Sequence, residues 1–162
     1  MEYEIINSKT NIIFNSFTKN GKDVGVQLRK GGEELGEIWE AEYNYNKNKT
    51  KENQEKLKKE LADGWILKTQ LKNFKKPNHN ELITIQCIAY NYLNETVSSC
   101  MNQYNISEKE LMPYIEEKLD RTIEIIMTMQ ALEIGYEEAK EIVLDYNKLV
   151  EKVTVSSKKY EQ

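Results

Sequence analysis

The stretch from Glu81 to Tyr104 is nearly free of charge, and it constrains the fold more than any other feature. Although 31% of the chain is charged, Glu81 and Glu95 are the only charged residues in this stretch. If it forms a helix, its apolar side chains cover about half of the circumference. A helix on a protein surface rarely needs so broad an apolar face. We therefore predict a central, buried helix around which the other segments pack. The apolar positions are Leu82, Ile83, Ile85, Ala89, Tyr90, Tyr92, Leu93, Val97, Cys100, Met101 and Tyr104.

Short runs in the first 75 residues alternate apolar and polar side chains, which is typical of strands. The expected strands are residues 3–6, 11–17, 24–28 and 37–45. Asn20-Gly21 and Gly31-Gly32 separate some of these runs, and both pairs tolerate the positive φ of tight turns. The sequence therefore predicts an antiparallel meander in this part of the chain.

A helix is predicted at residues 52–62, where Leu57 and Leu61 are spaced by four residues. Asp63-Gly64 is expected to end it, because glycine accepts the left-handed conformation at a helix C-terminus. Residues 65–74 could extend this helix, but their alternation favours a strand that returns to the sheet.

The second half of the chain has helical periodicity. After a polar break at 76–80, we expect three helices within residues 81–155 and a tail at 156–162. Ser107 and Glu110 form a capping box, and Pro113 either kinks the second of these helices or marks a later start. The predicted fold class is thus α+β. Residues 1–75 form an antiparallel sheet with one helix, and residues 81–155 form a bundle around the central helix.

The composition argues against several kinds of site. The single histidine, His79, lies in the polar break, and Cys87 and Cys100 would be about 20 Å apart on a helix. This leaves no zinc set and no triad built on histidine, so we expect no catalytic residues, metal or cofactor. The cysteines are expected to be buried free thiols, as in a reducing compartment. Without a long apolar run or a signal peptide, we expect a cytoplasmic protein with no membrane partner.

Charge is distributed unevenly along the chain. Residues 44–76 have a net charge of +6, whereas residues 105–145 have a net charge of −7. We predict a non-enzymatic protein that binds a protein partner through an acidic helical face. A face of this charge would suit a basic partner, such as a nucleic-acid-binding protein. The chain has 21 Lys and 2 Arg. This preference for lysine fits a phage- or plasmid-borne accessory factor or inhibitor of a host protein. The predicted partner-binding residues are Glu108, Glu116, Glu117, Asp120 and Glu124.

Nucleic-acid binding is the main alternative. Val97 to Ile115 resembles a helix-turn-helix, with Cys100, Ile106 and Leu111 at apolar positions and Asn105 in the turn. Such a resemblance implies a regulator that binds DNA, although the acidic second helix departs from the pattern. A lysine-rich segment could also contact nucleic acid, through Lys56, Lys58, Lys59, Lys68 and Lys72.

Two further alternatives stay open. One is an enzyme that uses a carboxylate pair such as Glu40 and Glu42, or Glu116 and Asp120, for acid and base chemistry. The other is a homodimer formed through apolar residues of the long helices.

Overall fold

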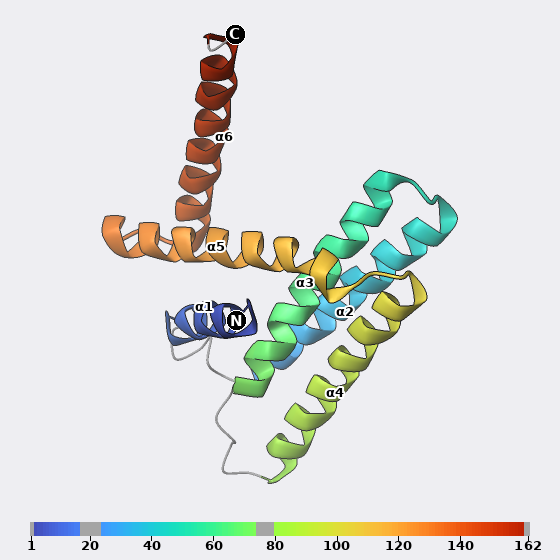
Figure 1. The fold of residues 1–162 in the computed structure, drawn as a ribbon. Coiled ribbons are helices and arrows are strands. Elements are labelled where there is room, and N and C mark those ends of the chain that lie inside the picture. The colour runs from blue at the N-terminus through green and yellow to red at the C-terminus, as the bar shows by residue number, and fades with distance from the viewer. Residues whose placement is uncertain (1, 17–23, 74–79, 161–162) are drawn as a thin grey trace. The chain divides into compact units, whose positions relative to one another are not determined.

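The computed structural model describes residues 2–16, 24–73 and 80–160, and within these ranges every regular element is an α-helix (Figure 1). The elements are α1 (Glu2–Ser16), α2 (Val24–Lys47), α3 (Lys51–Asn73), α4 (Asn80–Gln103), α5 (Glu108–Leu132) and α6 (Tyr136–Tyr160). The chain divides into two compact units, Met1–Leu119 and Asp120–Gln162, with the boundary inside α5.

The predicted α+β class is wrong, because the segments expected to form strands are helical. Residues 3–6 and 11–16 belong to α1, residues 24–28 and 37–45 to α2, and residues 65–73 to α3. In α2 two periodicities overlap in the same residues. Ile38, Ala41 and Tyr45 follow the helical spacing and are buried or half-buried, whereas Trp39 and Tyr43, which produced the alternation, are exposed. The helical period therefore decides the structure of this segment.

Glycine pairs also misled the turn predictions. Gly31 and Gly32 lie inside α2, and Gly64 lies inside α3, all without a positive φ. The predicted Asn20-Gly21 turn, His79 and most of the break at 76–80 lie outside the described residues.

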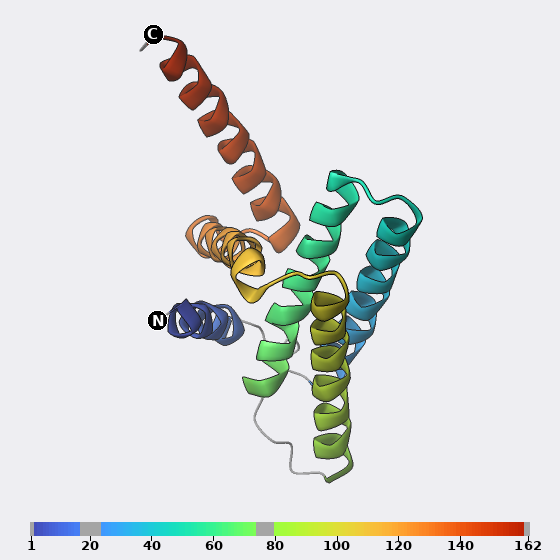
Figure 2. The ribbon, with the colours of Figure 1, turned by 45° about the vertical axis from the view of Figure 1, so that its right-hand side comes forward.

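The centre of the first unit is α3, which contacts α1, α2 and α4. Apolar side chains from nearly all around this helix are buried: Leu57, Leu61, Ala62, Ile66, Leu67 and Leu71. Figures 1 and 2 show α2 and α3 as neighbouring antiparallel helices, with α4 alongside them. Because α3 contacts three other helices, its apolar residues are not confined to the single stripe that is typical of a surface helix.

The helix predicted at 81–104 is confirmed as α4, but it is not covered all round. Leu93 and Val97 are inaccessible to solvent, whereas Ile88 and Tyr92 keep 61% and 52% of their surface exposed. Cys87 is also exposed, and Cys100 alone of the two thiols is buried as expected. The buried positions of α4 thus form a stripe facing α2 and α3.

The contact between α2 and α4 combines ring packing with hydrogen bonds. Trp39 and Tyr92 meet edge to face with ring centroids 6.4 Å apart. The Tyr104 hydroxyl lies 3.0 Å from a carboxylate oxygen of Glu42, and the Cys100 thiol lies 3.5 Å from its other oxygen. Burial and the Glu42 carboxylate raise the pKa of Cys100 to about 12, so this thiol stays protonated and unreactive at neutral pH.

The turn between α4 and α5 follows its sequence signals. Asn105 has a φ of 58°, and the Ile106 amide donates to the Met101 carbonyl at 2.8 Å, which closes α4 in a Schellman motif. The Ser107 hydroxyl accepts from the Glu110 amide at 3.2 Å and lies 3.4 Å from a Glu110 carboxylate oxygen, so Ser107 caps α5 as predicted. Because α5 begins at Glu108, Pro113 lies inside the helix and does not mark its start.

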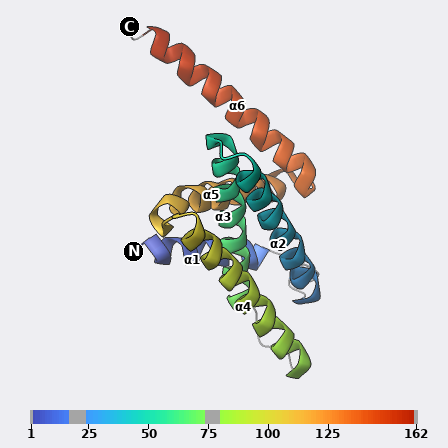
Figure 3. The same ribbon diagram turned by 90° about the vertical axis from the view of Figure 1, so that its right-hand side faces the viewer.

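The second unit contains the end of α5 and the whole of α6, which Figure 3 shows as one uninterrupted helix. Its core is small: among the described side chains, Ile125 packs with Ala139 and Val143, and Met129 and Ile134 partly cover them. The turn before α6 places Glu133 at a φ of 54°.

Gly64 provides a test of the packing of α2, α3 and α4. A Cβ atom added there would lie 2.9 Å from Ile38 Cδ1 and 3.1 Å from Val97 Cγ2, and both of those side chains are fully buried. We expect Gly64→Val to lower the free energy of unfolding by about 1 to 3 kcal/mol through overpacking. Urea denaturation measures this change.

The matched control is Gly36→Ala in α2, where an added Cβ meets no atom within 4 Å. It should raise the free energy of unfolding by up to about 1 kcal/mol, because alanine favours helix over glycine. The close approach at Gly64 is refuted if the valine variant is as stable as the alanine variant.

Candidate metal centre

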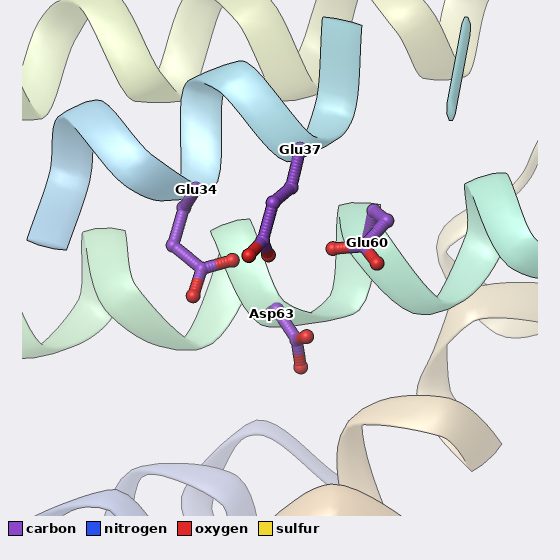
Figure 4. A group of neighbouring side chains, drawn as sticks. All are labelled: Glu34, Glu37, Glu60 and Asp63. Atoms are coloured by element: carbon purple, nitrogen blue, oxygen red, sulfur yellow. The ribbon is translucent and has the colours of Figure 1, made fainter. Parts of the chain in front are cut away.

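Four carboxylates from two helices meet on one side of the α2 and α3 hairpin. Glu34 and Glu37 are three residues apart on α2, and Glu60 and Asp63 have the same spacing on α3. Residues three apart share a helix face. Figure 4 shows Glu34 and Glu37 extending from α2 toward α3, where Glu60 and Asp63 lie. One carboxylate oxygen from each residue lies within 4.8 Å of the others, and we call the four residues the carboxylate tetrad.

The tetrad is partly withdrawn from solvent. Glu34, Glu60 and Asp63 are half-buried, and only Glu37 is exposed. One oxygen of Glu34 and one of Glu60 are fully buried and have no hydrogen-bond partner among the described residues. A buried acceptor without a donor costs free energy because it has lost its hydration. The tetrad therefore contains acceptor capacity that the protein itself leaves unmet.

Burial and mutual repulsion change how these carboxyls titrate. Desolvation, followed by the charges of Asp63, Glu37 and Glu60, raises the pKa of Glu34 from 4.5 to about 7. The pKa of Glu60 also rises to about 7, through desolvation and then through a hydrogen bond and repulsion from Glu37. Each shift means that the charged form is disfavoured in the folded protein.

Lys118 of α5 partly offsets this repulsion. Its ammonium nitrogen lies 3.4 Å from Asp63 Oδ1, and the Lys118 side chain is 57% exposed. Burial raises the pKa of Asp63, and Lys118 opposes that rise. A second ion pair, between Lys58 and Glu110 at 3.3 Å, helps to fix α5 beside α3. A single ammonium among four carboxylates still leaves a net negative site.

The tetrad has the donor chemistry of a site for a hard divalent cation. Mg²⁺, Mn²⁺ and Ca²⁺ prefer oxygen ligands, and carboxylates are their usual protein ligands. Oxygens on opposite sides of a Mg²⁺ ion lie about 4.2 Å apart, so small rotamer changes would bring the tetrad oxygens into coordinating range. Coordination by the four tetrad residues would leave further positions around the cation to water or a ligand.

The predicted partner-binding residues all lie on α5. Glu108, Glu117, Asp120 and Glu124 are exposed, and Glu116 is half-buried. The division into two units falls between Glu117 and Asp120. No observation in the structure tests partner binding by these residues, which stays a prediction.

The alternative nucleic-acid residues all lie on α3, but the structure does not bring them to one face. Lys56, Lys59 and Lys72 are exposed, whereas Lys58 pairs with Glu110. Lys68 donates to Asn94 at 2.8 Å and lies 3.9 Å from the centre of the Trp65 ring. Two of the five lysines therefore already have intramolecular contacts that fix α3 to its neighbours.

The tetrad was not predicted from the sequence, although its signal is present there. The carboxylate pairs considered there were Glu40 with Glu42 and Glu116 with Asp120, and neither belongs to the tetrad. The signal is the repeated spacing of two acids three residues apart, in two consecutive segments. It is visible only if both segments are taken as helices.

Comparisons with known proteins add no functional information. No family model matches the chain, no curated protein matches it, and no solved structure matches it. Among the described residues, the structure has no helix with the length and apolar character needed to cross a membrane.

The raised pKa values predict an unusual pH dependence of stability. Without divalent cations, Glu34 and Glu60 bind protons near pH 7 when folded but near pH 4.5 when unfolded. The folded state therefore holds more protons in this window, and the free energy of unfolding should fall as pH rises from 5.5 to 8. Urea denaturation in a chelator across this range measures the slope.

The control is the double variant Glu34→Gln with Glu60→Gln, which keeps the single histidine of the chain. Its amides do not titrate, so its stability should depend less on pH and should exceed that of the wild type at pH 8. Equal slopes for the two proteins would contradict the assignment of raised pKa values to these carboxyls.

Proposed function

We propose that the protein binds Mg²⁺ or Mn²⁺ at the carboxylate tetrad and hydrolyses a phosphoanhydride bond of a small-molecule substrate. The observation that carries this proposal is the convergence of four carboxylates with two buried oxygens that have no hydrogen-bond partner. Carboxylates on an ordinary charged surface would be hydrated and would not leave such oxygens buried without a partner.

The cation follows from the electrostatics of the tetrad. A divalent cation would replace the protons held by Glu34 and Glu60 and would coordinate the oxygens left without partners. Ligand carboxyls must lose their protons when a metal binds, so binding should strengthen as pH rises through 7. Lys118 supplies one positive charge, which is too little to neutralise the tetrad in place of a divalent cation.

The substrate class follows from the preferences of the cation. Mg²⁺ is commonly held by a few carboxylates and completes its coordination with water and substrate phosphates. Lys118, next to Asp63 and more than half exposed, supplies a positive charge on the α5 side of the tetrad. Phosphate oxygens are bound by such ammonium groups as well as by the metal.

The reaction is the addition of water to phosphorus. The oxygen of water forms a bond to phosphorus, the bridging P–O bond breaks, and the leaving phosphate departs with the electron pair of that bond. One water proton passes to a tetrad carboxylate that does not coordinate the cation. A cation held by the tetrad would stabilise negative charge on the phosphate oxygens.

Phosphate release from nucleoside di- and triphosphates and inorganic pyrophosphate tests the proposal. The wild type should release phosphate or pyrophosphate from at least one of them with Mg²⁺ or Mn²⁺ and not with a chelator. Glu60→Gln and Glu34→Gln should each lower kcat/KM by about 100-fold or more, since each removes a charged ligand.

Glu33→Gln is the matched control, because Glu33 is exposed on the same helix, next to Glu34, and lies outside the tetrad. Its activity should equal that of the wild type. Hydrolysis that survives in the chelator, or equal losses in the control and the tetrad variants, would contradict the proposal.

Binding of a protein partner through α5 is the second candidate function. Its support is the exposure of Glu108, Glu117, Asp120 and Glu124 on one helix. These residues do not belong to the tetrad, so the two functions are separable by mutation.

A further inference from the structure

Helix α6 carries an exposed apolar stripe in the second unit. Ile142, Tyr146 and Val150, spaced by four residues, keep 41%, 65% and 43% of their surface exposed. On the neighbouring stripe of α6, Ala139 and Val143 pack against Ile125 of α5. A helical hairpin with so few buried residues gains little from its own core, so covering the exposed stripe would add to its stability.

The sequence of α6 has the spacing of a coiled-coil seam. Ile142, Tyr146, Leu149 and Val153 follow one another at intervals of four, three and four residues. This is the alternation of a and d positions that lets two helices pack side by side. These four positions lie in the middle of a helix that runs from Tyr136 to Tyr160.

The charges along α6 indicate which partner fits the stripe. Residues 136–147 have four acids and one lysine, a net charge of −3, whereas residues 148–160 have four lysines and one acid, a net charge of +3. The helix is therefore complementary to a copy of itself in the opposite direction. A parallel pair would place like-charged halves together.

We propose that two copies of this chain associate through an antiparallel coiled coil of their α6 helices. In the register that aligns the seam, the Ile142 position of one copy lies opposite the Val153 position of the other, and the Tyr146 position opposite the Leu149 position. The same register aligns the acidic position Asp145 with the basic position Lys152, and Glu138 with Lys159. On each helix, the four positions along one side of the seam, 138, 145, 152 and 159, then lie opposite a position of opposite charge.

This inference does not depend on the proposed function, because the tetrad lies on α2 and α3 and the seam lies on α6. Loss of the dimer and loss of hydrolysis are therefore separate results. The competing occupant of the stripe is the first unit of the same chain, which would give a monomer at every concentration.

Sedimentation velocity of the full chain in about 0.1 M salt, between about 5 and 200 µM, tests the proposal; at this ionic strength close charge pairs still interact. The wild type should shift from monomer to dimer as its concentration rises. Tyr146→Glu should weaken the dimer by at least tenfold, because it introduces a charge into the apolar seam. A wild type that is monomeric throughout, or a dimer unaffected by this variant, overturns the proposal.

A charge exchange tests the orientation. Lys152→Glu alone should weaken the dimer by about tenfold, since it faces Asp145 with a like charge in both copies. Adding Asp145→Lys to it should restore the affinity to within about threefold of the wild type. Helicity by circular dichroism should be the same in all variants. Failure of the double exchange to restore association overturns the antiparallel register.

Discussion

Repulsion between four carboxylates at the α2 and α3 hairpin is the interaction that the rest of the molecule must accommodate. Two charged carboxylates within 4.8 Å of each other repel by about 3 kcal/mol or more at an effective dielectric constant of about 20. Burial makes the cost larger for Glu34 and Glu60, whose pKa values rise to about 7. Protons, Lys118 or a divalent cation must reduce this charge.

The hydrophobic core holds the hairpin closed against that repulsion. Ile38 of α2 and Leu57 and Leu61 of α3 are completely buried. Each such side chain contributes about 1.5 to 3 kcal/mol by leaving water. Gly64 lets the helices approach closely at this point, because any larger side chain would meet Ile38 and Val97. The core thus fixes the positions of α2 and α3, the two helices that carry the tetrad.

Repulsion of this kind lowers the stability of the fold, and proteins often keep such destabilising interactions at functional sites. Among the described residues, no intramolecular contact satisfies the buried oxygen of Glu34 or the buried oxygen of Glu60. A bound cation would convert the hairpin from a repulsive pair of helices into a bridged pair. Under the proposal, stability and function are therefore linked at the same four side chains.

The second half of the fold could be predicted from sequence, whereas in the first half only the helix at residues 52–62, which lies in α3, could be predicted. Glu81 to Tyr104 is helical as expected, and both the Ser107 cap and the left-handed Asn105 are present. These signals are local, because each depends on residues within one helical turn. The tertiary contacts of a helix depend on residues far apart in the sequence. The exposure of Ile88 and Tyr92 could therefore not be predicted from local signals.

In the first half, alternating side chains in residues 37–45 matched the period of a strand as well as that of a helix. Glu34 fell between two predicted strands and Glu37 at the start of the second, so the two could not be recognised as neighbours on one helix face. The choice of the strand period therefore led to the wrong fold class. It also hid the tetrad.

Titration of Mn²⁺ into the ¹⁵N-labelled protein, followed by the paramagnetic broadening of its amide signals, tests whether the tetrad is a divalent-cation site. At substoichiometric Mn²⁺, the amides of Glu34, Glu37, Glu60 and Asp63 should broaden first. The amides of Glu137 and Glu138, exposed acids at the start of α6, should stay sharp. Broadening that begins at the exposed acids, or spreads evenly over all acidic residues, would contradict a cation site at the tetrad.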